Sequence, residues 1–99
     1  MKTIPLFIVV HKWKKEEFKT VAKKVIEAMQ QLPEGMAMCT SYCDANQTGA
    51  WCLWEAESAE QLEKFLKKMI PEMSCDAKPV VQFFPPSPDL YMLMHTILS

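Results

Sequence analysis

The sequence contains no arginine. All eleven basic residues are lysines, and twelve acidic residues bring the formal net charge to −1. Arginine is the side chain that most often contacts phosphates and guanine edges with two parallel hydrogen bonds. A nearly neutral chain also creates no long-range field that attracts polyanions. We therefore expect no nucleic acid among the partners of this protein.

Glycine and long apolar runs are also scarce. With only Gly35 and Gly49, the chain has no glycine-rich loop to cradle a phosphate. No run approaches the ~20 apolar residues that a membrane span requires, and lysines rather than a small-residue cleavage site follow the first apolar run. The four cysteines, without secretory context, are expected to be reduced thiols or metal ligands. We expect a cytoplasmic protein without a membrane partner.

The remaining composition is that of one globular domain. The 99 residues are 49% hydrophobic and 23% charged, which excludes a disordered chain and allows one modest core. Residues 14–32 and 58–70 carry apolar side chains at three- and four-residue steps, the pattern of amphipathic helices. Ser58 and Gln61 have the spacing of a capping box at the start of the second helix. A proline follows each helix and ends it.

Apolar and β-branched runs predict the strands. They lie at residues 4–11, 36–43, 50–56 and 80–84, and a polar turn at residues 44–49 joins the second run to the third. The order strand–helix–strand–strand–helix–strand predicts an α+β fold, a ferredoxin-like βαββαβ sandwich with sheet order 4-1-3-2 and both helices on one face. Because the strands are apolar on both parities, we expect a homodimer through the open sheet face.

Residues 87–99 form a tail beyond the domain, which we place at residues 1–86. The tail begins with Ser-Pro-Asp, the order of a helix cap at Ser87, a first-turn proline and a first-turn acid. A helix is therefore predicted. A strand is the alternative, because residues 90–98 are largely apolar at both odd and even positions. So apolar a tail is expected to dock on its own domain or on the partner subunit.

His11, Cys43 and Cys52 are the candidate metal ligands. In a 4-1-3-2 sheet the first strand ends beside the start of the third, and the second strand ends at the same edge, so the three side chains converge. One imidazole and two thiolates suit zinc, nickel or copper. Cys39 should share a face with Cys43 but lie about 13 Å away along the strand. The competing interpretation is that the cysteines are small core residues and His11 is solvated.

Aromatic residues and one acid form a second candidate site. Trp13, Trp51 and Trp54 are candidates for the wall of a small-molecule pocket, and Tyr42 arrives at the same sheet edge as Trp51. Aromatic residues in strands more often serve packing. Glu55 stands inside the third strand, where a carboxylate indicates a pocket, an edge or an ion pair with a lysine. We predict Trp13, Tyr42, Trp51 and Glu55 as ligand-binding residues.

Three sequence runs resemble a known group of proteins: PEGMAMCTSYCD, GAWCLWEAESAEQLEKFLKK and AKPVVQF. Within residues 4–84 the chain resembles short prokaryotic proteins of uncharacterised function with a ferredoxin-like, dimeric α/β-barrel fold. A related group includes small nickel-binding proteins, and its matching residues here are Ser41-Tyr42, Cys52, Glu55-Ala56 and His11. The resemblance implies a dimeric barrel, with nickel or another transition metal as the cofactor.

Three functions follow as hypotheses. The first is a small homodimeric protein that binds a small ligand, with a transition metal at His11, Cys52 and Cys43. The second is a cofactor-free enzyme of the dimeric α/β-barrel fold, of monooxygenase or isomerase type. In that enzyme His11 or Glu55 would carry a proton beside an aromatic pocket. The third is an interaction module whose tail binds a partner.

Overall fold

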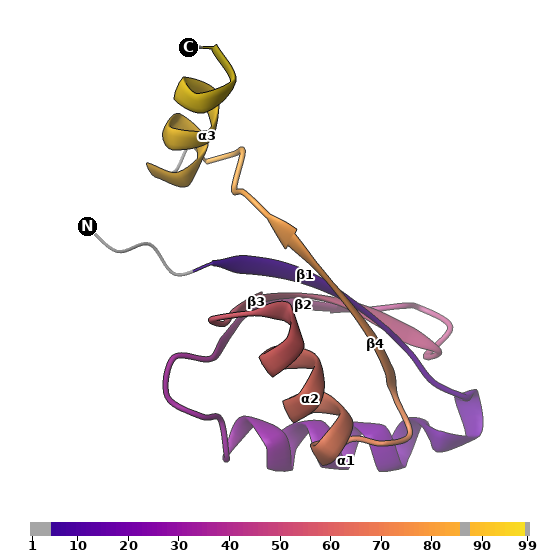
Figure 1. Cartoon of the computed structure of the whole chain (residues 1–99). Coiled ribbons are helices and arrows are strands. Elements are labelled where there is room, and N and C mark those ends of the chain that lie inside the picture. Colours follow the sequence, from indigo (N-terminus) through magenta and orange to yellow (C-terminus); the bar gives the residue numbers. More distant parts are fainter. Residues whose placement is uncertain (1–4, 86–87, 99) are drawn as a thin grey trace.

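The structure, a computed structural model, describes residues 5–85 and 88–98. The predicted strand start at Ile4 and helix cap at Ser87 lie outside the described residues. The described part is an α+β protein with a four-stranded antiparallel sheet and three α-helices (Figure 1). In chain order the elements are β1 (Leu6–Lys12), a 3-10 turn (Lys15–Glu17), α1 (Phe18–Met29), β2 (Ala37–Cys43), β3 (Gly49–Glu55), α2 (Ala59–Met69), β4 (Ser74–Val80) and α3 (Pro88–Leu98).

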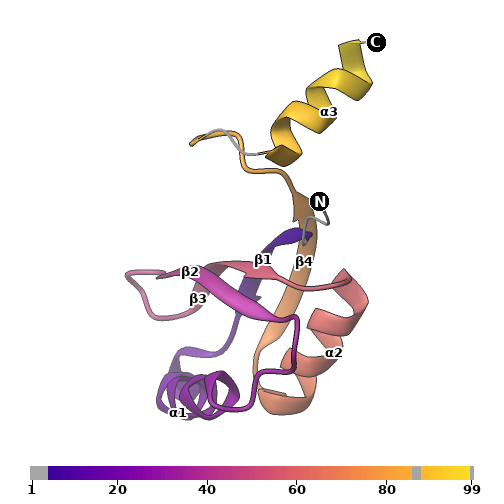
Figure 2. The same ribbon diagram turned by 90° about the vertical axis from the view of Figure 1, so that its left-hand side faces the viewer.

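The sheet is covered by helices on one face only. Its strands run in the order β2-β3-β1-β4, and each neighbouring pair is antiparallel. Helices α1 and α2 lie on the same side of the sheet, below it in Figure 1. Helix α2 packs on β4 and against α1, and an ion pair between Lys24 and Glu72 ties α1 to the segment after α2. The other sheet face has no covering helix in the described chain (Figures 1 and 2).

Strand β1 lies in the middle of the sheet and contributes to both faces. Phe7, Val9 and His11 are buried beneath the helices, whereas the residues between them are partly exposed on the open face. This alternation follows from the two-residue period of a strand. Around β1 the buried side chains form the main core, whose members are Phe7, Val9, Met36, Ala50, Cys52, Trp54, Ala56, Leu62 and Leu66.

Both predicted helices of the domain are present. Helix α2 begins after Ser58, whose hydroxyl accepts a hydrogen bond from the backbone N–H of Gln61 at 3.1 Å, so the predicted cap is confirmed. Helix α1 is shorter than the predicted 14–32, because the chain first forms a 3-10 turn and the helix ends at Met29. Pro33 disfavours a helical conformation in the residue before it, which explains why the helix stops short of the predicted end.

The predicted hairpin of β2 and β3 is present, and its turn is tied to the end of β1. Asp44 accepts a hydrogen bond from the backbone N–H of Asn46, and Trp13 donates from Nε1 to a turn carbonyl at 2.7 Å. Gly49 begins β3 at a close approach, since a Cβ there would lie 2.8 Å from the carbonyl oxygen of His11. A larger residue at this position would push β3 away from β1.

A β-bulge at Cys39 interrupts β2. Met38 pairs with Trp54, whereas Thr40 pairs with the residue directly before Trp54, so Cys39 is the extra residue. An inserted residue shifts the two-residue alternation of a strand by one. The prediction that Cys39 shares a face with Cys43 is therefore wrong.

Strand β4 occupies Ser74–Val80 rather than the predicted 80–84. The prediction followed the most apolar run, but β4 is an edge strand whose residues alternate between exposed and partly buried. Cys75 and Ala77 are the residues that pack against the core. Pro79 is tolerated because an edge strand has one side without hydrogen-bonded neighbours.

The tail is helical, as predicted, but it extends away from the domain (Figures 1 and 2). Along α3 the apolar side chains are exposed, including Tyr91 at 66%, Ile97 at 68% and Leu98 at 75%. The radius of gyration of 14.9 Å exceeds the ~13 Å of a compact chain of this length. In the described ranges, no helix has the length and apolar character needed to cross a membrane.

Replacing Leu62 with alanine tests the core. Leu62 is fully buried, whereas Ile26 on α1 is 61% exposed. We expect Leu62→Ala to lower the free energy of unfolding by about 2–5 kcal/mol through lost packing and a residual cavity. Ile26→Ala, the matched control, should change it by less than about 0.5 kcal/mol. Urea denaturation measures both, and equal effects of the two substitutions would contradict the described core.

Candidate functional site

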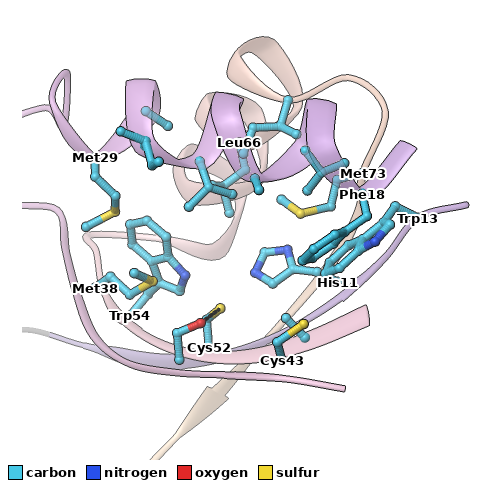
Figure 3. Close-up of a pocket in the computed structure, with 18 residues that line it drawn as sticks. His11, Trp13, Phe18, Met29, Met38, Cys43, Cys52, Trp54, Leu66 and Met73 are labelled. Carbon is cyan, nitrogen blue, oxygen red and sulfur yellow. Dashed lines mark hydrogen bonds between the residues drawn. The ribbon is translucent and has the colours of Figure 1, made fainter. Parts of the chain in front are cut away.

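A cavity of about 300 Å³ lies between α1 and the covered face of the sheet (Figure 3). The central strands form its floor, α1 forms its opposite wall, and α2 closes it from the side. Its lining residues are His11, Trp13, Phe18, Val21, Ala22, Val25, Ile26, Ala28, Met29, Met38, Ser41, Cys43, Ala50, Cys52, Trp54, Leu66, Ile70 and Met73. This volume is at the lower end of the range for small-molecule sites.

The lining is almost entirely carbon and sulfur. None of its residues is an aspartate, glutamate, lysine or arginine. The polar atoms available come from His11, from Ser41, from the thiols of Cys43 and Cys52, and from the indole nitrogens. Moving an unpaired charge into such surroundings is strongly unfavourable. The cavity therefore suits a neutral and largely apolar molecule.

His11 brings the one imidazole of the cavity. Its side chain is 3% exposed, and its Nδ1 lies 3.3 Å from the sulfur of Cys75 on β4. Burial lowers the pKa of His11 from its ordinary 6.5 to about 4, because the interior disfavours the charged ring. At neutral pH the ring is therefore uncharged, with one nitrogen bound to the thiol and the other facing the cavity (Figure 3).

The buried cysteines are thiols rather than thiolates. Burial raises the pKa of Cys52, although the side chains of Ser41 and Trp54 oppose this rise, and Ser41 Oγ lies 3.1 Å from the Cys52 sulfur. Burial, with the nearby charge of Glu63, raises the pKa of Cys75 to about 12. A thiolate is the nucleophile and the metal ligand of cysteine, so neither group is activated for either role.

Trp54 carries a donor that the protein leaves unused. Its side chain is 3% exposed and its Nε1 makes no hydrogen bond within the described residues. A buried N–H without an acceptor costs about 1–3 kcal/mol. Figure 3 shows the indole at one end of the cavity, with its nitrogen edge toward His11. Such an unpaired polar group is often found at a functional site.

The structure brings together only part of the predicted site. His11, Cys43 and Cys52, which were predicted to converge, all line the cavity, and so does Trp13, a predicted pocket-wall residue. The other predicted ligand-binding residues, Tyr42, Trp51 and Glu55, do not line it. Tyr42 and Trp51 pair with each other across β2 and β3. Their side chains are 68% and 50% exposed, because their positions in the strand alternation turn them to the open sheet face.

Cys75 is the partner of His11 that the sequence analysis missed. The fourth strand was predicted six residues too late at its start and four too late at its end, so Cys75 fell outside every predicted strand. The alternation of small or apolar residues with polar ones over residues 74–78 is the signal that could have located it.

The donors of the cavity do not form a metal-ligand set. Within residues 5–85 and 88–98, no group of three or more His, Cys, Asp or Glu side chains is placed to hold a metal ion. The raised thiol pKa values add a cost, since a metal must displace the protons. The site of His11, Cys43 and Cys52 for nickel or another transition metal therefore stays a prediction without structural support.

The buried His11 should make stability depend on pH. Its folded-state pKa of about 4 lies below the ordinary 6.5, so the neutral ring favours the folded protein. Its contribution is complete above pH 6.5 and is lost as the pH falls from 6.5 to about 4, amounting to roughly 3 kcal/mol.

Urea denaturation of wild type and His11→Gln across this range measures the effect. The wild type should lose stability relative to His11→Gln as the pH falls, because carboxylates contribute equally to both proteins. His95→Gln, at an exposed position on α3, is the control and should follow the wild type. Parallel curves for wild type and His11→Gln would contradict the buried neutral imidazole.

Comparison with curated proteins and with solved structures gives no significant match. A family match does cover residues 5–83, close to the range over which the resemblance to uncharacterised proteins was noted. It gives no support to the expected relation to nickel-binding proteins. Because the match spans most of the chain, the protein belongs to the family described as Domain of unknown function (DUF3303).

Proposed function

We propose that this protein is a cytoplasmic, homodimeric binding protein for a small, neutral and largely apolar molecule. The observation that carries the proposal is the cavity of about 300 Å³, which has an uncharged lining and a buried imidazole at its centre. Ligand sites are typically apolar, with a few polar groups that orient the ligand. Here those groups are His11, Trp54 and Ser41.

The proposed fold type is the ferredoxin-like sandwich of a dimeric α/β barrel. The order β2-β3-β1-β4, counted from the β4 edge, reads 4-1-3-2. Helix α1, which connects β1 to β2, and helix α2, which connects β3 to β4, lie on one face of the sheet. These two features support the assignment. In such a dimer the open sheet faces of two copies would pack together.

The open sheet face supports a second copy as its cover. Leu6, Ile8, Val10 and Leu53 are partly exposed there, and Trp51 is half exposed. Charged residues of both signs lie at its margin: Asp76 and Lys78 on β4 pair with Val10 and Ile8, and Lys12 and Glu55 stand at opposite ends of the β1–β3 pair. A face that carries both signs of charge can be complementary to a copy of itself, as a twofold interface requires.

Helix α3 adds a second exposed apolar surface. It has no lysine or arginine, so it lacks the cationic side chains that hold an amphipathic helix on an anionic membrane. A helix that is apolar all round is normally buried. We propose that α3 contacts the partner subunit, which makes the tail part of the same homodimer.

An enzyme is the second candidate, and His11 is the observation that favours it. The ring nitrogen not bound to Cys75 faces the cavity, where it can exchange a proton with a bound molecule. Glu55, the other predicted proton carrier, does not line the cavity. A cofactor-free monooxygenase or isomerase would therefore use His11 as the proton carrier without Glu55. A bound ligand in contact with the ring would have to raise the pKa of His11.

A matched pair of probes tests the binding function. Methyl 2-naphthoate is a neutral ester, and 2-naphthoate is the anion of the parent carboxylic acid. We expect calorimetry to detect binding of the ester and at least about tenfold weaker binding of the anion, because the uncharged lining cannot compensate a carboxylate. Ala22→Leu, which fills the cavity from α1, should weaken ester binding. Lys23→Leu, at an exposed position outside the lining, should not.

Three results would change the proposal. Equal binding of ester and anion would contradict an apolar site. Stoichiometric metal in native mass spectra of protein purified without chelator or a nickel column would return the metal hypothesis to first place. Chemical conversion of the ester, abolished by His11→Gln, would favour the enzyme over the binding protein.

Sedimentation velocity tests the homodimer. A stable interface of this kind buries about 800 Å² on each subunit, so the wild type should sediment as a dimer at micromolar concentration. Trp51→Glu places a charge in the middle of the open face and should yield a folded monomer. Lys67→Glu, at an exposed position on α2, is the control and should remain dimeric. A wild-type monomer would contradict the proposed assembly.

A further inference from the structure

Trp54 differs from the other two tryptophans in the use of its indole nitrogen. Trp13 donates from Nε1 to the carbonyl of Gln47 at 2.7 Å, and Trp51 is half exposed, where water can accept its hydrogen bond. Trp54 is buried, and its Nε1 makes no hydrogen bond in the described residues. The sulfur of Cys52, a weak acceptor, is the group of the chain that interacts with this indole, so the N–H is open to a stronger acceptor.

The surroundings of Trp54 leave room for such an acceptor. The Cys52 sulfur on the same strand is close enough for the Trp54 indole to lower the pKa of the thiol. It makes no well-formed hydrogen bond with Nε1, however, and lies 3.1 Å from Ser41 Oγ. Met29 and Met38 flank the indole in Figure 3. Methionine side chains are unbranched and rotate readily, so they can yield to a ligand atom that approaches the indole edge.

Trp54 stands at one end of the cavity and His11 near its middle, with Trp13 and Phe18 beyond it (Figure 3). Ala50, the partner of His11 in the register, lies four residues before Trp54 on β3, a separation of about 13 Å along the strand. Both rings lean into this space (Figure 3). His11 is held at its Nδ1 by Cys75. A flat molecule between the two rings would meet the indole N–H at one end.

We propose that Trp54 determines the ligand specificity of the cavity by donating its Nε1–H to a carbonyl or ether oxygen of the bound molecule. The ligand class is then a neutral aromatic compound that bears such an oxygen. The inference rests on the proposed binding function and adds to it the chemical group that is recognised. A buried donor discriminates strongly, because an analogue without the acceptor leaves it unpaired.

Acetophenone and α-methylstyrene form a matched pair for the test. They have nearly the same shape, and only acetophenone has an oxygen that accepts a hydrogen bond. The affinity of each probe is measured for wild type and for Trp54→Phe. The ratio of the two affinities is compared between probes, because the hydration of the free probe cancels in each ratio. We expect Trp54→Phe to weaken acetophenone binding roughly tenfold, the effect of one hydrogen bond to a buried donor. The α-methylstyrene affinity should change much less.

Lys67→Glu is the control, because Lys67 is exposed on α2 and lies outside both the cavity lining and the open sheet face, and it should leave both affinities unchanged. A second measurement uses the wild type alone, so it does not depend on whether Trp54→Phe folds. In ¹⁵N-labelled wild type, the indole N–H resonance of Trp54 should move on addition of acetophenone and stay in place with α-methylstyrene.

The outcomes separate this inference from the proposed function. Equal weakening of both probes by Trp54→Phe, or an indole resonance that does not respond to acetophenone, would overturn the role of Trp54 while leaving an apolar binding cavity intact. Failure of both probes to bind the wild type would contradict the cavity function itself, and the inference with it.

Discussion

The alternation of side chains along β1 is the constraint on which the rest of the structure depends. Phe7, Val9 and His11 must point to the same face because a strand has a period of two, and β1 is paired on both edges. The helices cover that face, so the imidazole is buried together with the core. The apolar residues between them are left on the other face. One strand thus contributes to both the cavity and the exposed apolar surface at which we propose the second subunit.

The cavity costs stability, and this cost indicates function. A core of this size would be more stable with a leucine in place of the buried His11. It would also be more stable if the indole N–H of Trp54 made a full hydrogen bond. Natural proteins depart from such local rules mainly at functional sites. Because the departures at His11 and Trp54 occur in one cavity, the single ligand that we propose would account for both.

The sequence was sufficient where the structure depends on local signals. Helix α2 could be predicted from its period, its cap at Ser58 and the proline after it. The hairpin could be predicted from its polar turn. The helical tail followed from its first three residues. Each of these signals lies within a few residues of the element it specifies, and none depends on how distant strands pair.

The errors arose where the structure depends on contacts between distant residues. Nothing in the residues around Cys39 indicates an insertion, since a bulge is defined by the partner strand. Edge strand β4 needs only one apolar face, so its polar alternation was overlooked in favour of a more apolar run. That error hid Cys75, whose contact with His11 joins residues 64 apart in the chain. The separation of Trp51 from Cys52 is of a different kind, since it follows from the two-residue period of a single strand.

Strand β3 connects the two proposed surfaces of the protein. Cys52 and Trp54 face the cavity, while Trp51 and Leu53 face the open side of the sheet. A partner packed on the open side would restrict the same strand that carries the proposed recognition residue. If the dimer holds β3 in the arrangement that the ligand prefers, dimerisation strengthens ligand binding, and by thermodynamic linkage the ligand strengthens the dimer to the same extent. In this proposal, a four-stranded sheet covered on one side gives ligand binding and assembly a shared structural element.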